Sequence, residues 1–386
     1  MKRLSIAVAA VIAAGNAYAV DTQNARALGQ GGTSVVAGNY GSASVNPAMA
    51  SVLSDSDNFG FRINAGAEAS DEDDFLDSLD QTQDEIDLLQ QKIDNSSAAP
   101  GDETAVLDAI QDLEGKVVEI NAGTDLQVAI PSQYIGAALF VKSDIRAALD
   151  FEDNTPAGLD FSDFSGSTDV EDVIDSEVQV SGYGITDVGV ALSHRYNGLG
   201  IGDLIVGVSP KFQRIDLISK TENVSDFDTG DIRDDVTEDT GFNADLGAIY
   251  MLGENRQYRV GATVRNVVPR SVEGASGETF DLEPQASLAI GYDNGWIATS
   301  IEADATDSPS YGQAKAVKFA RFGLELDAYK WAQFRVGVRH DLNGVKEDVM
   351  TAGIGLSPMD VINVDLAGIY GKNNTYGAAV QIGARF

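Results

Sequence analysis

The last eleven residues of the chain, Tyr376 to Phe386, constrain the fold most. Apolar or small side chains alternate there with small or polar ones, and the chain ends on an aromatic residue. A period of two is the pattern of a β-strand with one apolar face. A final strand of this kind is typical of the closing strand of outer-membrane β-barrels. We therefore predict an assembly signal that includes Tyr376, Ile382 and Phe386, although a soluble edge strand could show the same alternation.

The first nineteen residues have the pattern of a secretory signal peptide. Lys2 and Arg3 precede an apolar run from Leu4 to Ala14, and small residues stand at Ala17 and Ala19. The run is shorter than the roughly 20 apolar residues that a membrane-spanning helix needs. The pattern predicts a signal peptide over 1–19 and export of the chain. No later stretch is expected to cross a bilayer as a helix, so membrane residence would depend on strands.

Composition excludes several classes of protein. The chain has 386 residues and no cysteine, which rules out disulfides, thiol catalysis and cysteine metal sites. Its formal net charge of −34 argues against nucleic acid as a partner, because phosphates would be repelled. Three segments, 71–119, 150–177 and 222–239, contain 34 of the 60 acidic residues and interrupt the strand pattern. They are expected to be long loops, which face outward in outer-membrane barrels.

The alternating pattern predicts an all-β fold, a transmembrane antiparallel β-barrel of about 14 strands over 57–386. An even count suits a single-chain bacterial barrel and places both ends of the wall in the periplasm. The location expected is the outer membrane of a Gram-negative bacterium. The expected strands cover about 59–67, 124–131, 134–150, 176–196, 200–220, 240–252, 257–271, 279–292, 296–306, 315–328, 332–341, 349–356, 361–370 and 375–386.

The polar face of these strands carries charges of both signs. Ions are costly against lipid but can pair in a hydrated lumen. A soluble acidic β-sandwich with ion pairs on its solvent face is the alternative. The charges predicted to face the lumen are Arg62, Asp245, Arg259, Arg265, Glu302, Asp304, Arg321, Glu325, Arg335, Arg339, Asp365 and Arg385.

The segment 71–120 follows a different period. Apolar residues recur every three or four positions from Phe75 to Ile93 and again from Val106 to Ile120. This spacing predicts two amphipathic helices, joined by a turn at Pro100 and Gly101, with Asp102 as N-cap of the second. The first extracellular loop would thus contain an acidic α-helical hairpin. It could be a surface lid or docking feature, or a solvated loop that packs on itself.

The segment 20–56 is rich in small residues and poor in charge, and we expect it to plug the lumen. The residues expected to form or gate the plug are Gly29, Gly31, Gly32, Asn46, Pro47 and Ala48. A glycine-rich start followed by Asn-Pro-Ala resembles the plug of FadL-type outer-membrane transporters of long-chain fatty acids and aromatic hydrocarbons. The whole chain is similar to the conjugal transfer protein TraF branch of that superfamily. Further short segments carry this resemblance in order: VRNVVPR (264–270), LEP (282–284), RFGLELD (321–327), RVGVRHDL (335–342) and TAGIGLSP (351–358).

The resemblance implies a fourteen-strand barrel whose N-terminal hatch blocks the lumen and whose passage serves hydrophobic molecules. The alternative is a surface structural, adhesion or conjugation-accessory protein without transport activity. An apolar pocket between plug and wall would favour transport, and a filled lumen with a rigid projecting hairpin would favour the alternative. The expected partners are outer-membrane lipid and lipopolysaccharide, the barrel assembly machinery and a hydrophobic ligand.

An enzymatic function is not expected. The two histidines, His194 and His340, fall near opposite ends of the predicted barrel and cannot share a hydrolytic site. The glycines at 29–32 lack the lysine of a phosphate loop. No cofactor and no defined metal site is expected. The acidic residues at 226–234 only partly match a calcium loop, so loose binding of divalent cations at the acidic loops is the most they suggest.

Overall fold

A computed structural model describes residues 24–52, 59–71, 74–130, 132, 134–156, 158–160, 163–164, 169–170, 173–225, 236–328, 331–358 and 361–386. The predicted signal peptide, the ends of the predicted plug and the acidic residues at 226–234 lie outside the described residues. Within the described part of the chain, no helix is both long enough and apolar enough to cross a membrane.

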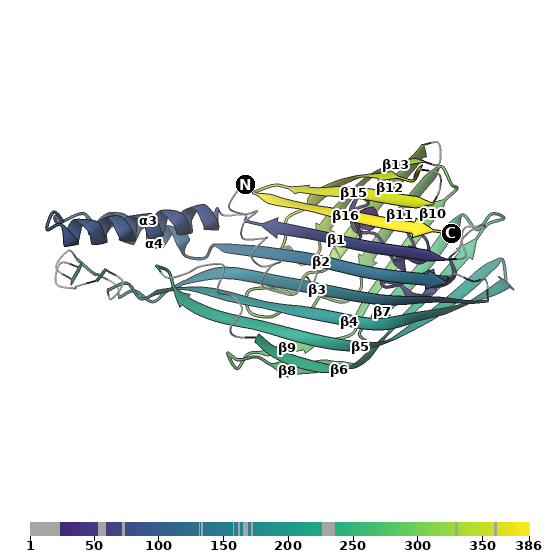
Figure 1. Cartoon of the computed structure of the whole chain (residues 1–386), viewed down its shortest axis with the longest axis horizontal. Helices are drawn as coiled ribbons and strands as arrows, with labels where there is room; N and C mark the ends of the chain where they lie inside the picture. The colour runs from purple at the N-terminus through teal and green to yellow at the C-terminus, as the bar shows by residue number, and fades with distance from the viewer. Residues whose placement is uncertain are drawn as a thin grey trace.

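Fourteen antiparallel strands close into one barrel, as the alternating pattern predicts (Figure 1). Each strand pairs with its neighbours in the chain, and β1 closes the ring against β16. The barrel strands are β1 (Gly60–Ser70), β2 (Val117–Ile130), β3 (Ile135–Asp153), β4 (Ser176–Leu199), β5 (Gly202–Asn223), β6 (Val236–Leu252), β7 (Tyr258–Arg265), β10 (Gln285–Asp293), β11 (Ile297–Asp304), β12 (Phe319–Ala328), β13 (Ala332–Asp341), β14 (Val349–Leu356), β15 (Ile362–Gly371) and β16 (Thr375–Arg385).

The two faces of the wall have opposite chemistry. On β13, Phe334, Val336 and Val338 are about half exposed, whereas Arg335 is 4% exposed. The apolar side chains face outward, where a bilayer covers them, and the charged ones face the lumen. The chain therefore has the fold of a Gram-negative outer-membrane barrel. Short turns join the strands at the end where the C-terminus lies, and long connections lie at the other end (Figure 1).

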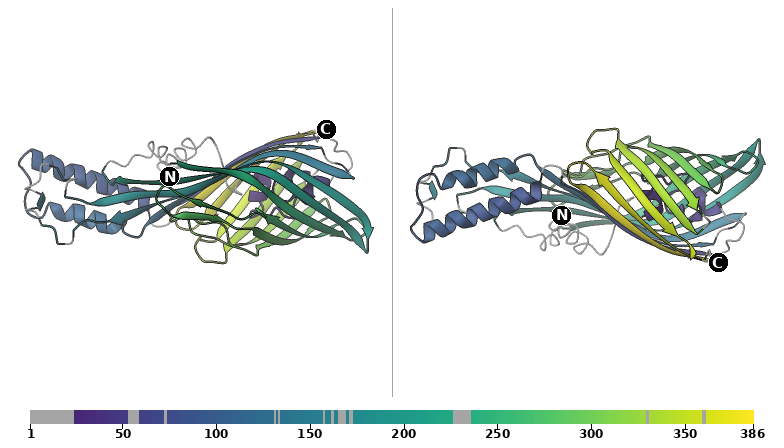
Figure 2. Two further views of the ribbon diagram at one scale, coloured as in Figure 1. Left: turned by 90° about the horizontal axis from the view of Figure 1, so that it is seen from below. Right: turned by 90° about the horizontal axis from the view of Figure 1, so that it is seen from above.

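The wall is taller on one side than on the other. Strands β3 to β6 have 17 to 24 residues, whereas β7 and β10 to β16 have 8 to 11. About 9 to 11 tilted residues cross a bilayer, so the longer strands continue beyond it at the long-loop end (Figure 2). Part of the acidic sequence predicted to be loop therefore belongs to these extensions.

The helical hairpin covers the outer face of this extension. It consists of α3 (Phe75–Asp94) and α4 (Glu103–Leu113). The helical spacing placed residues as far as Ile120 in the second helix, but β2 begins at Val117, so Val118 and Ile120 belong to that strand. They share the outward face of that strand with Leu126, and both are fully buried in one core with Phe75 and the α4 side chains. The hairpin packs on the outside of the wall rather than across the lumen.

Asp71 caps the N-terminus of α3, whereas Asp102, the predicted N-cap of α4, makes no side-chain cap. Asp71, just after β1, accepts hydrogen bonds from the backbone N–H of Phe75 (2.6 Å) and of Leu76 (3.4 Å). Burial raises the pKa of Asp71, although these hydrogen bonds act in the other direction. Asp102 stands at the N-cap position of α4 but makes no side-chain cap. Its carboxylate instead binds Lys92 and the N–H of Ala99, both at 2.8 Å.

A separate hairpin packs against the inward face of the tall wall. The seventh and eighth predicted strands are too long, because residues 266–284 leave the wall and form β8 (Arg270–Glu273) and β9 (Thr279–Leu282). Asn266 has a φ of 54°, which turns the chain, and Pro269 and Pro284 offer no N–H for a ladder. We call β8, β9 and residues 305–318 the cap. Its side chains pack on the inward face of the tall wall, in a core of Tyr183, Ile185, Ile215, Leu217, Val272, Phe280, Leu282 and Tyr311.

Candidate functional site

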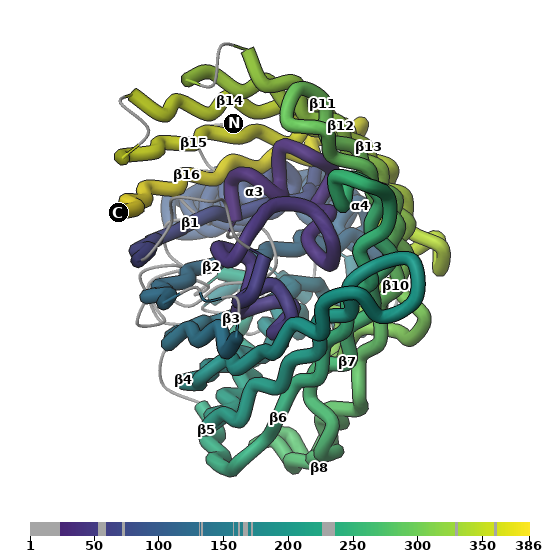
Figure 3. The backbone as a smooth tube through the Cα atoms, turned by 90° about the vertical axis from the view of Figure 1, so that its right-hand side faces the viewer, coloured from purple at the N-terminus to yellow at the C-terminus, as the bar shows by residue number. Residues whose placement is uncertain are grey.

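The N-terminal segment lies inside the barrel and crosses it near the short-turn end (Figure 3). Its described part, residues 24–52, is called the plug below. It contains α2 (Ala25–Leu28) and the 3-10 helices η1 (Tyr40–Ser42) and η2 (Pro47–Ser51). Hydrogen bonds join it to β2, β4, β7, β11, β12 and β14. The plug is therefore attached around most of the circumference.

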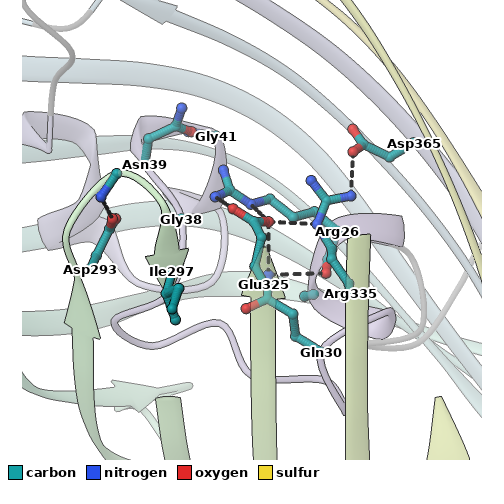
Figure 4. A network of polar contacts seen from close by, with 12 residues as sticks. Arg26, Gln30, Gly38, Asn39, Gly41, Asp293, Ile297, Glu325, Arg335 and Asp365 are labelled. Atoms are coloured by element: carbon teal, nitrogen blue, oxygen red, sulfur yellow. Dashed lines mark hydrogen bonds and ion pairs between the residues drawn. The ribbon is translucent and has the colours of Figure 1, made fainter. Parts of the chain in front are cut away.

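An ion network that is buried on the wall side and partly exposed at Arg26 binds α2 to the wall (Figure 4). Arg26 Nη2 lies 2.6 Å from Glu325 Oε1, and Arg26 Nε lies 3.0 Å from Glu325 Oε2. Arg335 lies 2.5 Å from the same carboxylate and 2.5 Å from Asp365. Two cations and two anions balance, which is the condition for holding charges out of water. Burial lowers the pKa of Arg26, but the attraction of Glu325 outweighs burial and raises it overall.

Other wall side chains bind the plug backbone. Glu302 Oε2 accepts hydrogen bonds from Ser34 N (2.8 Å) and Val35 N (2.9 Å). Arg259 Nη1 donates to the carbonyls of Val36 (3.1 Å) and Gly38 (2.9 Å). Backbone groups shielded from water need such partners. The charges of the lumen thus satisfy a segment that has almost no regular secondary structure of its own.

Asn46 fixes the turn before η2. Its side-chain oxygen accepts a hydrogen bond from Ala48 N (3.1 Å), and its nitrogen donates to the Val35 carbonyl (2.7 Å). Pro47 is the first residue of η2, where its missing N–H costs nothing. The Asn46, Pro47 and Ala48 segment therefore ties two parts of the plug together and lies against β5 and β6.

The plug approaches the wall at glycines that sequence reasoning did not identify. A Cβ at Gly207 would meet the Pro47 and Ala48 backbone, and one at Gly337 would meet Gly31. The same holds for Gly136 against Ala50, Gly247 against Asn46 and Gly323 against Gln30. These wall positions are needed for close contact with the plug. From the sequence alone, the only sign that these glycines contact the plug is their position on the polar face of a strand.

The plug glycines serve the same close approach. Gly31 and Gly32 have φ values of 71° and 89°, which other residues rarely adopt. A Cβ on Gly31 would meet the carbonyls of Phe322 and Val338, and one on Gly29 would lie 3.1 Å from Gly353 Cα.

Two cavities adjoin the plug. The vestibule, of about 410 Å³, opens at the short-turn end and is lined by polar groups that include Arg62, Arg259, Asp365 and Arg385. The central cavity, of about 110 Å³, has Leu28 and Gly32 of the plug on one side and Ser308 and Val317 of the cap on another. Its lining also includes Arg265, Asp304, Arg321 and Arg339. Asp245, the remaining predicted lumen charge, pairs with Lys211 at 2.9 Å.

The predicted assembly residues lie at the outer surface. Ile382 and Phe386 are 48% and 64% exposed, and the Tyr376 ring lies 5.8 Å from that of Tyr370. Phe386 and Phe59 exchange two backbone hydrogen bonds of 2.9 and 3.0 Å, which join the two ends of the wall.

The histidines and acidic groups form no shared site. His194 accompanies Tyr196 near the short-turn end, whereas His340 contacts Asp348 at the long-loop end. Within the described ranges, no group of three His, Cys, Asp or Glu side chains could hold a metal ion.

Known structures share this architecture. The Ralstonia pickettii toluene transporter TbuX matches with a TM-score of 0.55 and 11% identity, over 93% of this chain and 97% of that one. A Pseudomonas aeruginosa FadL homologue matches with a TM-score of 0.51 and 11% identity, over 96% and 99%. The Pseudomonas putida toluene transporter TodX matches with a TM-score of 0.50 and 11% identity, over 95% of this chain and 97% of that one. At such identity the likeness shows the fold, and two of these neighbours are described as toluene transporters.

The family comparison covers more than half of the chain. No curated protein matches it. A family model described as the TraF protein of the F plasmid transfer operon matches residues 43–304, from the middle of the plug to the end of β11. The chain therefore belongs to the TraF family of the F plasmid transfer operon, built on a FadL-like barrel.

Proposed function

We propose that this barrel passes small hydrophobic molecules across the outer membrane and that the plug is its gate. The observation that carries the proposal is the position of the plug, which lies across the lumen with a cavity on either side. Its attachments are hydrogen bonds, ion pairs and packing, and the chain has no cysteine that could make them permanent. Such contacts can break and re-form, as a gate requires.

The lining of the central cavity combines two kinds of surface. Leu28, Val317 and Phe319 offer apolar contact, and the surrounding charged side chains form ion pairs with one another. This mixed lining differs from the purely apolar pocket that would most simply indicate hydrophobic transport. The FadL-like fold nevertheless supports the proposal, because solved barrels of this architecture are described as hydrocarbon transporters.

A reversible lock on the plug tests the proposal. Ser51 of the plug and Ser193 of β4 have their Oγ atoms 2.7 Å apart. Because the chain contains no cysteine, the double variant Ser51→Cys with Ser193→Cys would carry a single disulfide between plug and wall. We expect the oxidised form to block uptake of radiolabelled toluene by cells and reduction to restore it. The single Ser51→Cys variant, treated identically, is the control.

The outcome would separate transport from a structural role. Uptake that is the same in cells with and without the protein would overturn the transport function. Uptake that depends on the protein but is equal for the oxidised and the reduced double variant would overturn the gating role of the plug.

A role in conjugation is a second proposal, supported by the family and by the hairpin. The α3–α4 hairpin extends beyond the barrel strands at the long-loop end and has a core continuous with the wall (Figure 1). Such a fixed projection suits contact with another cell surface. Removing residues 75–113 should lower mating frequency if it makes that contact. Unchanged mating with normal protein levels would count against this role.

A further inference from the structure

The central cavity concentrates positive charge in an acidic protein. Five basic side chains line it, against three acidic ones, although the whole chain has a net charge of −34. The basic residues are Arg146, Arg265, Arg321, Arg339 and Lys346, and the acidic ones are Glu68, Asp304 and Asp307. The lining residues thus carry two more positive than negative charges, although Glu119 and Glu302, outside the lining, pair with Arg146, Lys346 and Arg321.

Two of the arginines use only part of their hydrogen-bonding capacity. Arg146 Nη2 donates to Glu119 at 3.1 Å, and Arg339 Nη2 donates to Glu68 at 2.6 Å. The Nε atoms of both side chains are buried and have no hydrogen-bond partner among the described residues. The side chain of Arg146 is only 3% exposed. A buried donor without a partner destabilises the protein, and more strongly when the group is charged.

A third donor belongs to the same lining. Gln285, the first residue of β10, also has a buried side-chain nitrogen with no partner in the described ranges. Three buried groups of this cavity therefore need acceptors, and all three are N–H donors. A ligand that only accepts hydrogen bonds would satisfy them together.

The neighbouring groups hold the cationic wall in place. The Phe319 ring contacts two guanidinium groups, with Arg321 Cζ at 5.1 Å and Arg339 Cζ at 4.7 Å from its centroid. Lys346 binds Glu119 at 2.8 Å, so this carboxylate pairs with two cations. These contacts fix the cations around a small space before any ligand enters.

We propose that the central cavity is a binding site for an oxyanion of the size of a carboxylate or a phosphate. A cavity of about 150 Å³ can hold benzene, and the 110 Å³ here suits a small anionic group rather than a long apolar chain. The anion could be a free solute or the head group of a longer amphiphile, which share this chemistry. Entry to the site rests on the proposed passage, but binding to the purified protein does not.

Calorimetry on the full-length barrel in maltoside micelles tests this site. Inorganic phosphate and acetate probe binding of a free anion, and octanoate probes binding of an anionic head group. Octyl glucoside is the control for octanoate, because it has an eight-carbon chain but no charge. The variant Gln285→Met removes one donor without breaking a described ion pair. Arg339→Lys keeps the charge that pairs with Glu68 but removes Nε. Gln333→Met, at a buried glutamine of the wall on the other side of the plug, is the control.

We expect at least one oxyanion to bind, and octyl glucoside not to bind at the same site. Gln285→Met and Arg339→Lys should each weaken binding by roughly tenfold, the effect of one hydrogen bond to a charged group. Gln333→Met should have no effect. Binding of acetate or phosphate would identify a free anion, and binding of octanoate alone would identify a head group.

Two results would overturn the site. One is the absence of binding for all three anions, and the other is binding that neither cavity variant weakens while both retain heat-modifiable gel mobility. Because these measurements need no transport, a failure of the passage or of the gate would leave them unaffected.

Discussion

Arg26 of the plug and Glu325 of β12 form a two-point contact inside the barrel, with distances of 2.6 and 3.0 Å. Glu325 also accepts from Arg335 at 2.5 Å, so one wall carboxylate lies between a plug cation and a wall cation. Its loss would leave two guanidinium groups close together with one fewer anion. The stability of the closed plug should therefore depend strongly on this carboxylate.

Replacing Glu325 should release the plug. In Glu325→Gln both the buried contact with Arg335 and the partly buried contact with Arg26 lose their anion, and breaking a buried ion pair costs about 3 to 5 kcal/mol. We expect the barrel to remain folded and the plug to become sensitive to protease in detergent. The control is Glu238→Gln. Glu238 pairs with Arg214 at the surface, and its side chain is 55% exposed. Exposed pairs contribute about 0 to 1 kcal/mol, so this control should behave as wild type.

A methyl group at a wall glycine should have a similar effect by a steric route. In Gly207→Ala the new Cβ would collide with the Pro47 and Ala48 backbone, which cannot move without the rest of η2. Overpacking of this kind costs about 1 to 3 kcal/mol. Gly368→Ala is the matched control, because the nearest atom to its Cβ is a carbonyl oxygen 3.8 Å away. Equal protease resistance of the plug in both variants would contradict the close-contact role of Gly207.

The barrel could be predicted from the sequence because each wall strand is marked by alternation within its own few residues. The expected strands at 332–341 and 349–356 have the observed bounds, since alternation there ends at clear turns. The long strands of the tall wall were predicted except at their ends, where acidic residues such as Glu222 and Asp239 were taken as loop, although strands beyond the bilayer tolerate them. The hairpin β8–β9 of the cap was missed because residues 266–284 alternate as wall strands do. Alternation alone does not tell a strand of the wall from a strand of a separate hairpin. Partners of Asn46 or Gly207 depend on residues far along the chain, which no local pattern specifies.

The hairpin tip should lie outside the cell. Residues 95–101 join α3 to α4 and are largely exposed, with Ser96 at a φ of 54°. A protease site inserted at Ser97 should be cut in intact cells, because exposed loop tips are readily cleaved. The same site inserted next to Ser357, in a short turn, should be cut only after the outer membrane is opened. The reverse pattern of cleavage would invert the orientation of the barrel.

The terminal aromatic residue should be needed for assembly. Phe386 contacts the Phe59 ring at a centroid distance of 6.4 Å and continues the closing pair of strands. Replacing it with serine should lower the amount of heat-modifiable barrel in the outer membrane several-fold, because the closing strand is predicted to carry the assembly signal. Tyr134→Ser, at another exposed aromatic near the short-turn end, is the control. Normal levels of the Phe386 variant would argue against that signal.

The central claim is that the plug closes an existing passage, and single-channel conductance in planar bilayers tests it most directly. A variant lacking residues 25–40 loses α2, the Arg26 contact and the backbone that Glu302 binds, while β1 remains complete. We expect the intact protein to be almost closed and the deletion variant to form stable open pores at the same membrane potential. A deletion variant that inserts and is heat-modifiable, yet conducts no better than the intact barrel, would contradict the claim.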